Sequence, residues 1–191
     1  MSPLGHITTY SGLPFNLANP TQEMVRIEDI AHHLSLVCRW AGAPHHLLSV
    51  AQHSVLVSKI VPPELRRWAL LHDAAEAYIG DLTRPLKVLV PAIHEIEERI
   101  MHVIADKFGL SWPEPWNLVS YDNQIAKLEA ALFIRNHDGL YESYEGNICD
   151  IADLRPDQQL SLSDIEPMAA HEAEMLFLWR YRRLFEDDDG M

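Results

Sequence analysis

Residues 70–82 read LLHDAAEAYIGDL, and this stretch predicts how the rest of the chain is organised. Its apolar residues are typical of a helix, yet ten of its positions contain four ionisable side chains: His72, Asp73, Glu76 and Asp81. On a helix, His72 and Glu76 would share one face, because residues four apart lie above one another. Buried ionisable groups are costly unless they are paired or bind a metal. The stretch therefore predicts a helix that carries a metal site.

The composition predicts a single folded domain, residues 1–191. The chain has 191 residues, and 48% of them are hydrophobic, which is enough for a full core. No apolar run approaches the ~18 residues that span a bilayer, and no signal peptide is evident. The chain contains two cysteines, Cys38 and Cys149. A reduced, cytoplasmic location and no membrane partner are expected.

The charge excludes one class of partner. The formal net charge is -13 with histidines neutral, whereas a nucleic-acid-binding protein needs a basic face. No nucleic-acid partner is therefore expected. A small phosphorylated substrate is compatible with this charge, because a metal ion and a few local cations can outweigh the global field.

Helical periodicity predicts an all-α bundle of about six or seven helices. Residues 1–20 are expected to form an extended segment or small hairpin, residues 83–87 a loop, and residues 186–191 an acidic tail. Residues 137–163 carry no site that the sequence supports. The main predicted helices cover residues 27–40, 50–60, 64–80, 91–108, 119–136 and 164–179.

Two histidines and two acids on different predicted helices form the candidate site. Ser49 and Gln52 have the spacing of a capping box, which places His53 in the first turn of its helix. The next helix carries His72 and Asp73, and an antiparallel helix pair can bring such side chains together. Asp122 stands near the start of a later helix. This nitrogen and oxygen donor set suits Mn, Co, Fe, Ni or Zn better than Ca or a thiolate-type structural zinc site, and four protein ligands leave positions open for water.

These residues resemble the defining pattern of the HD-domain phosphohydrolases: His53, the pair His72-Asp73, and Asp122. The similarity is closest to the branch of small 5′-deoxynucleotidases and phage dATP triphosphohydrolases. It is carried by residues 27–32, 38–40, 49–54 and 71–87. It implies a single HD-type domain and a homo-oligomer, either a dimer or a hexamer.

The resemblance also implies a role for each site residue. One divalent ion, Co²⁺, Mn²⁺, Zn²⁺ or Fe²⁺ with Mg²⁺ as a further option, would be held by His53, His72, Asp73 and Asp122. Glu76 would orient the attacking water or accept its proton, and Asp81 would assist proton transfer at the phosphate ester. The substrate would be contacted by Arg39 at phosphate, by Trp40 at the sugar or base, and by Arg84 and Lys87 at the other phosphate oxygens.

The implied enzyme is a hydrolase that converts dATP, and also dADP and dAMP, to deoxyadenosine by attack of water at the α-phosphorus. One alternative is a broad 5′-deoxynucleotidase acting on deoxynucleoside monophosphates. An alternative of another class is a non-catalytic HD-fold nucleotide sensor. The guanosine-tetraphosphate hydrolases are disfavoured because Ala77 stands where they have a second acid, and the large deoxyguanosine triphosphohydrolases are usually much longer. The sequence leaves open the base preference, the number of phosphates on the substrate and the native metal.

Overall fold

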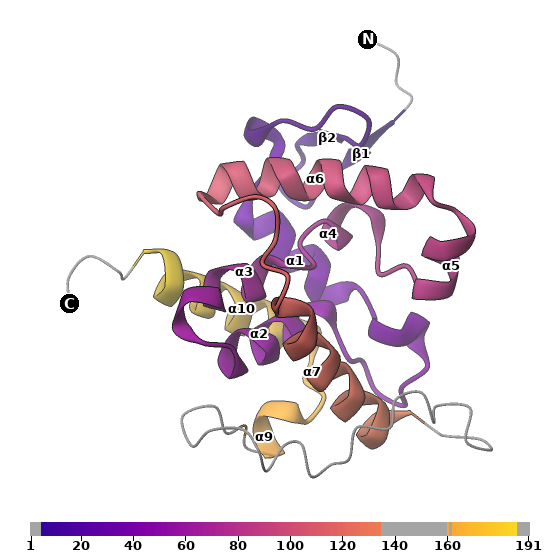
Figure 1. Ribbon diagram of the computed structural model, residues 1–191, viewed down its shortest axis with the longest axis vertical. Coiled ribbons are helices and arrows are strands. Elements are labelled where there is room, and N and C mark those ends of the chain that lie inside the picture. Colours follow the sequence, from indigo (N-terminus) through magenta and orange to yellow (C-terminus); the bar gives the residue numbers. More distant parts are fainter. Residues whose placement is uncertain (1–4, 135–159, 161, 187–191) are drawn as a thin grey trace.

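The structure, a computed structural model, describes residues 5–134, 160 and 162–186. This part of the chain is an assembly of helices with a small hairpin near its N-terminal end (Figure 1), which confirms the all-α prediction. Among the described helices, none is both long enough and apolar enough to cross a membrane. The α-helices are α1 (Ile27–Leu36), α2 (Val50–Ile60), α3 (Arg66–Leu71), α4 (Glu76–Ile79), α5 (Arg84–Leu89), α6 (Ala92–Phe108), α7 (Leu118–Phe133), α9 (Leu162–Ile165) and α10 (Ala170–Phe185).

Helix α2 lies at the centre of the fold. Every one of its residues except Lys59 is buried, and it packs against α1, α3, α7 and α10. Its N-terminus is capped as predicted, with the Gln52 backbone N–H donating to Ser49 Oγ over 3.2 Å. The second half of the capping box is absent, because the Gln52 side chain donates instead to the Glu166 carbonyl, 2.8 Å away. That amide ties the segment before α10 to the central helix.

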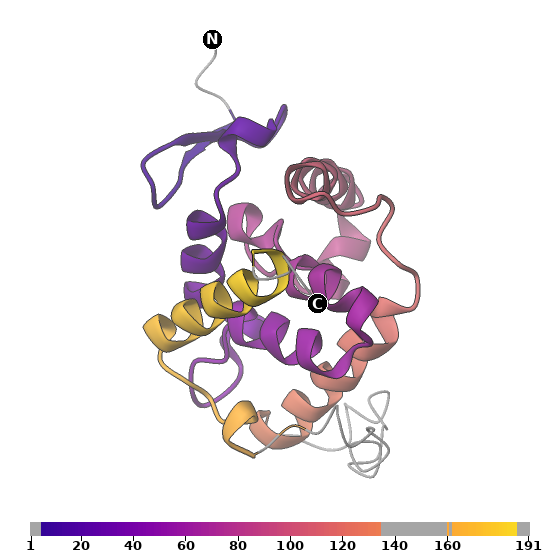
Figure 2. The same cartoon turned by 90° about the vertical axis from the view of Figure 1, so that its left-hand side faces the viewer.

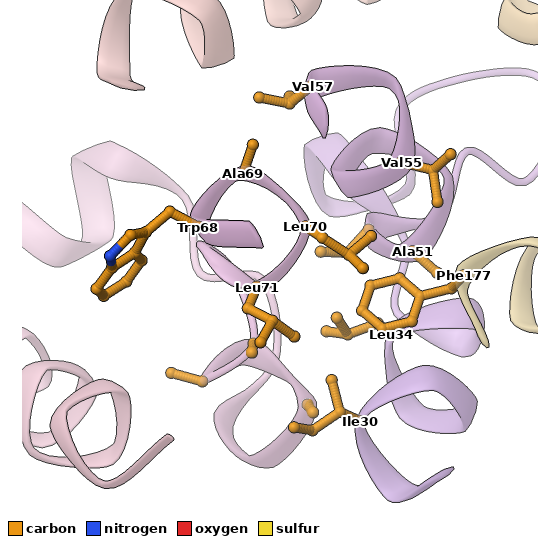
Figure 3. Packing of buried hydrophobic residues seen from close by; sticks show 14 of the residues in the cluster. Ile30, Leu34, Ala51, Val55, Val57, Trp68, Ala69, Leu70, Leu71 and Phe177 are labelled. Atoms are coloured by element: carbon orange, nitrogen blue, oxygen red, sulfur yellow. The ribbon is translucent and has the colours of Figure 1, made fainter. Parts of the chain in front are cut away.

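The core forms where α1, α2, α3 and α10 meet (Figure 3). Leu34, Leu70, Leu71 and Phe177 are each fully buried there. Removing a side chain of this size from water contributes ~1.5–3 kcal/mol to stability. This packing holds α2 beside α3, and so determines how far His53 can lie from the end of α3.

The predicted helix 64–80 is interrupted between α3 and α4. Through this stretch, backbone N–H groups donate to carbonyls three residues earlier: Ala74 to Leu71 at 2.9 Å, Glu76 to Asp73 at 3.0 Å and Ala77 to Ala74 at 3.3 Å. Such bonds wind the chain to ~3 residues per turn, so side chains three apart are eclipsed. Asp73 and Glu76 accordingly line one cavity together, and His72 is not among the residues that line it.

The N-terminal hairpin packs onto α4 from outside. Strands β1 (His6–Thr8) and β2 (Pro14–Asn16) pair antiparallel, which confirms the predicted small hairpin. Phe15 is fully buried and stacks on Tyr78 with ring centroids 3.7 Å apart. The hairpin thereby supports the short helix that carries Glu76.

Helix α6 spans the upper part of the molecule, and Figure 2 views it nearly along its axis. It ends at Gly109, which has φ = 66°, a left-handed conformation that glycine adopts without steric cost. The connection before it differs from the prediction, since residues 84–89 form α5 rather than a loop. Pro85 in the first turn of α5 accounts for this, because that position needs no backbone N–H.

Several predicted boundaries are also corrected. Helix α1 ends at Leu36 rather than residue 40, because Val37 is extended and Cys38 pairs with Ser49 in an isolated β-bridge. The predicted last helix is divided into α9 and α10 around Pro167, which lacks the N–H that a continuous helix needs. Helix α7 ends at Phe133. Most of the 137–163 segment and nearly all of the predicted acidic tail lie outside the described residues.

Candidate metal centre and its cavity

His53 is oriented by a buried acid. It lies in the first turn of α2 and is fully buried, and its Nδ1 is 2.8 Å from Oε1 of Glu129 on α7. Since a carboxylate can only accept, Nδ1 carries the proton and donates. The other ring nitrogen, Nε2, is hydrogen-bonded to Asp122 Oδ1 at 3.0 Å, and once deprotonated it is the nitrogen that can ligate a metal ion.

A backbone carbonyl orients His72 in the same way, by a hydrogen bond to its Nδ1. It follows the last residue of α3, and its Nδ1 lies 2.8 Å from the carbonyl oxygen of Ala69. A carbonyl also only accepts, so Nδ1–H donates and Nε2 is again the available nitrogen. This Nε2 is buried and has no hydrogen-bond partner. An orphaned nitrogen of this kind fits a metal ligand.

Two carboxylates face these nitrogens. Asp122 Oδ1 lies 3.0 Å from His53 Nε2 and 3.9 Å from His72 Nε2. Asp73 Oδ2 lies 3.2 Å from His72 Nε2 and 3.8 Å from His53 Nε2. Ligands ~2.1 Å from one ion would be about 3–4 Å apart, which matches these separations. His53, His72 and Asp122 thus form a group able to hold a metal ion, with their ligand atoms within 4.8 Å of one another, and Asp73 adjoins it.

The charges of the group are strongly coupled. Burial opposes ionisation of Asp73, but the charge of His72 outweighs it and lowers the Asp73 pKa to about 2. Burial likewise opposes ionisation of Asp122, whose pKa is nevertheless lowered by its hydrogen bond to His53 and by the charges of both histidines. The pKa of His72 is raised, since its carboxylate neighbours outweigh its burial. The carboxylates thus favour a positive charge at their centre, which a divalent ion would supply without protonating the imidazoles.

Glu129 is the site residue that the sequence analysis missed. Its side chain is completely buried and accepts from His53, from Arg39 (Nη2, 3.0 Å) and from the Trp40 indole N–H (3.2 Å). The Arg39 guanidinium and His53 lower the Glu129 pKa against the effect of burial. The available signal was its position seven residues after Asp122, two helical turns along the same predicted helix.

Arg39 and Trp40 come from a tight 3₁₀ segment, Arg39–Gly42, and not from a helix end as expected. Trp40 and Ala41 have φ values of 58° and 50°, in the left-handed region that costs a non-glycine residue ~1–2 kcal/mol. The segment is anchored by the Arg39 N–H, which donates to the Leu48 carbonyl at 2.8 Å. Strained backbone of this kind is concentrated at functional sites.

A cavity of about 490 Å³ opens beside the group, within the ~300–1,000 Å³ range of ligand pockets. We name it the cation cavity. It is bordered by the carboxylates of Asp73 and Asp122, and the predicted site residues that are not metal ligands also line it. These are Arg39, Trp40, Glu76, Asp81, Arg84 and Lys87.

Two acids of the cation cavity, Glu76 and Asp81, hold protons more tightly than ordinary carboxyls. Glu76 is 4% exposed, and its pKa is raised well above its usual range by burial and by the charges of Asp73 and Asp81. Its Oε1 lies 3.6 Å from the Lys87 ammonium, and its Oε2 has no partner. Burial likewise raises the pKa of Asp81. Two acids with such shifts in a cavity are typical of general acid–base chemistry.

All ten predicted site residues thus lie in one region, although Arg39 differs from the expectation. Its guanidinium is largely occupied by the buried pair with Glu129, and its Nη1 lies 3.7 Å from Asp73 Oδ2. Lys87 is partly occupied too, with its Nζ 2.7 Å from Glu97 on α6. Arg84 is exposed at the cavity wall.

The chain is similar to two bacterial proteins. It is 46% identical over 107 residues to the uncharacterized protein YfdR of Escherichia coli. This match covers 56% of the chain and 60% of YfdR. It is also 37% identical over 134 residues to the uncharacterized protein RCAP_rcc00048 of Rhodobacter capsulatus. This second match covers 63% of the chain and 68% of that protein. The matched segment therefore spans less than two thirds of YfdR. No family model matches the chain.

Proposed function

We propose that this chain, which belongs to the same family as the Rhodobacter capsulatus protein RCAP_rcc00048, is a metal-dependent phosphohydrolase of deoxynucleotides. The observation that carries the proposal is the convergence of the His53 and His72 Nε2 atoms on two carboxylates at the wall of the cation cavity. The resemblance of the same residues to the HD-domain phosphohydrolases supports it.

The metal ion would be held by His53, His72, Asp73 and Asp122. Imidazole and carboxylate ligands favour a transition metal such as Co²⁺, Mn²⁺, Zn²⁺ or Fe²⁺. When bound, such an ion supplies Lewis acidity, which lowers the pKa of water and polarises a phosphoryl oxygen. The second ring nitrogens of both histidines are already held by Glu129 and the Ala69 carbonyl, so the ligand atoms are pre-oriented.

Glu76 and Asp81 would move the protons of the hydrolysis. Water attacks the α-phosphorus, and Glu76 accepts the proton that the water loses. The bond between phosphorus and the 5′-oxygen breaks, and the leaving 5′-oxygen takes a proton from Asp81. The raised pKa values of both acids suit these roles, because general acids and bases work best when their pKa lies near the operating pH.

The cations of the cavity would bind the substrate phosphates. Lys87 is the best placed, since it contacts Glu76 on one side and Glu97 on the other without being buried. Arg84 lies at the same wall, and Arg39 would contribute through Nη1. Positive groups that face a transferring phosphoryl group stabilise the charge that develops in the transition state. Trp40 would pack against the sugar.

Attack at the α-phosphorus gives two outcomes according to the substrate. A deoxynucleoside triphosphate yields the deoxynucleoside and tripolyphosphate, and a monophosphate yields the deoxynucleoside and orthophosphate. We propose dATP, with dADP and dAMP, as the preferred substrates on the strength of the resemblance. The same site would serve a broad 5′-deoxynucleotidase if monophosphates alone were hydrolysed.

Product analysis tests this proposal. The metal-stripped protein is incubated with each dNTP, each dNMP and ATP after addition of Co²⁺, Mn²⁺, Zn²⁺, Fe²⁺ or Mg²⁺, and nucleosides and phosphates are separated. Deoxyadenosine with tripolyphosphate is the expected result. Glu76→Gln should retain the metal and lose at least ~100-fold in rate, whereas Glu95→Gln, an exposed acid outside the cavity, should keep wild-type turnover. No hydrolysis with any metal would contradict the proposal.

A further inference from the structure

A second cavity borders the metal centre on another side. It has a volume of about 360 Å³ and reaches Asp73 and Asp122, which also line the cation cavity. We name it the tryptophan cavity after three indole rings in its wall. The side chains that matter below are those of Trp68, Trp112, Trp116, Glu97, Glu98 and Glu114.

The two cavities differ in their charged groups. The cation cavity is lined by Arg39, Arg84 and Lys87 beside four acids, whereas five acids and no lysine or arginine occur among the described residues that line the tryptophan cavity. A chain of phosphates would find cations to bind only in the first of these two cavities and would be repelled from the second. A substrate whose reacting phosphorus lies at the metal centre would therefore direct its polyanionic end and its uncharged end to different sides.

The tryptophan rings are arranged as a surface for a flat ligand. Trp68 is 4% exposed, and its indole N–H is held by the Ser111 carbonyl at 3.0 Å. The ring of Trp112 lies 6.2 Å from that of Trp68 and is partly exposed. Trp116 is 88% exposed, although an exposed indole loses the favourable burial of a large apolar surface. Stacking of a nucleobase would cover these rings.

The acids of the same cavity select one kind of base edge. Lys87 engages Glu97, and His94 lies 3.6 Å from Glu98. In the described part of the chain, no hydrogen bond or ion pair occupies the carboxylate of Glu114. Burial raises the pKa of Glu114, and in its ionised form this carboxylate only accepts hydrogen bonds. It therefore favours a base that presents an exocyclic amino group, as adenine and cytosine do, over thymine, whose exocyclic oxygens are acceptors.

We infer that the tryptophan cavity is the nucleobase subsite and that it selects amino-bearing bases, an inference that rests on the proposed function. The phosphates occupy the cation cavity, the α-phosphorus lies at the metal centre, and the base stacks on Trp116 and Trp112. Glu114 accepts a hydrogen bond from the exocyclic amino group. Trp40, which lines the cation cavity, is then left to contact the sugar and does not select the base.

Two variants and two matched controls test the subsite in the metal-loaded protein. Trp116→Ala should raise KM for dAMP and dATP by roughly tenfold, the usual effect of losing a stacking partner, while inhibition by inorganic tripolyphosphate stays as in the wild type. Glu114→Gln should narrow the preference for dAMP over dTMP. The controls are Trp179→Ala, an exposed tryptophan on α10, and Glu95→Gln; both should leave these values unchanged.

Calorimetric binding of deoxyadenosine and thymidine separates this inference from the proposed function. If the wild-type protein hydrolyses no nucleotide, the proposed function fails, and the subsite is judged on binding alone. Deoxyadenosine binding that is tighter than thymidine binding and weakened by Trp116→Ala supports the inference. It is overturned if neither nucleoside binds, if Trp116→Ala binds deoxyadenosine as the wild type does, or if Trp40→Ala alone removes the base preference.

Discussion

His53 Nδ1 lies 2.8 Å from Glu129 Oε1, and both side chains are completely buried. This contact decides which nitrogen of His53 faces the metal site. The same carboxylate binds the Arg39 guanidinium and the Trp40 indole. One buried acid on α7 thereby links the metal centre to the strained segment that lines the cation cavity.

Substitution Glu129→Gln should weaken metal binding. The amide can still accept from His53, but it brings no negative charge to the imidazole or to Arg39. Loss of such a supporting partner typically lowers metal affinity ~10–100-fold, and breaking a buried ion pair lowers stability by ~3–5 kcal/mol. Titration calorimetry with Co²⁺ or Zn²⁺ and thermal unfolding measure the two effects. Gln124→Ala, exposed on the same helix, is the control, and an unchanged affinity in Glu129→Gln would show that Glu129 does not orient His53.

His72→Ala and Asp73→Ala should each abolish metal binding and all hydrolysis. Each change removes a metal-ligating atom that the remaining residues cannot replace, because Nδ1 of His53 is already hydrogen-bonded to Glu129. Metal content after dialysis and turnover of the best substrate are the measurements. His171→Ala, an exposed histidine on α10, should behave as the wild type. Wild-type turnover in either site variant would remove that residue from the metal centre.

The metal-free protein should become less stable as the pH rises past the usual titration range of a glutamate, and Glu76→Gln should relieve part of this loss. Burial raises the folded-state pKa of Glu76 well above its value in the unfolded chain, ~4.3. Between these two pKa values the folded protein holds a proton that the unfolded chain has released. The free energy of unfolding therefore falls as the pH rises through this interval, and it stays lowered above it.

Thermal unfolding between pH 4 and pH 8 measures this effect. The melting temperature of Glu76→Gln should exceed that of the wild type at pH 8, and the difference should shrink toward pH 4. The exposed Glu95→Gln should shift the curve little at any pH. A wild-type stability that rises between pH 5 and pH 8 in parallel with that of Glu76→Gln would mean that Glu76 is not penalised by burial.

Ala41→Gly should be more stable than Ala43→Gly. Both changes add the same freedom to the unfolded chain, but only Ala41 has a positive φ, whereas Ala43 has φ = −66°. The difference in unfolding free energy should equal the left-handed strain of an alanine, ~1–2 kcal/mol. Denaturant unfolding of the two variants gives this difference directly. Equal stabilities would show that the segment Arg39–Gly42 is not strained in solution.

Local sequence rules were sufficient for several parts of the fold. The Ser49 cap, the extent of α2 and the end of α6 at Phe108 depend on neighbours along the chain, and all three were predicted. The break at residues 72–75 was not, because a run of good helix formers gives no local reason for it. The interruption is what turns Asp73 and Glu76 to one face.

The sequence by itself determined the all-α class and the residues of the candidate metal group, because helical periodicity and a mixed set of imidazoles and carboxylates can be recognised along the chain. Only the tertiary structure decided what surrounds that group. Glu129 lies 76 positions from His53, and its role depends on α7 packing beside α2. The separation of cations from tryptophans into two cavities likewise arises from loops and helices that meet only in the folded chain, where burial and charge are set by neighbours distant in sequence.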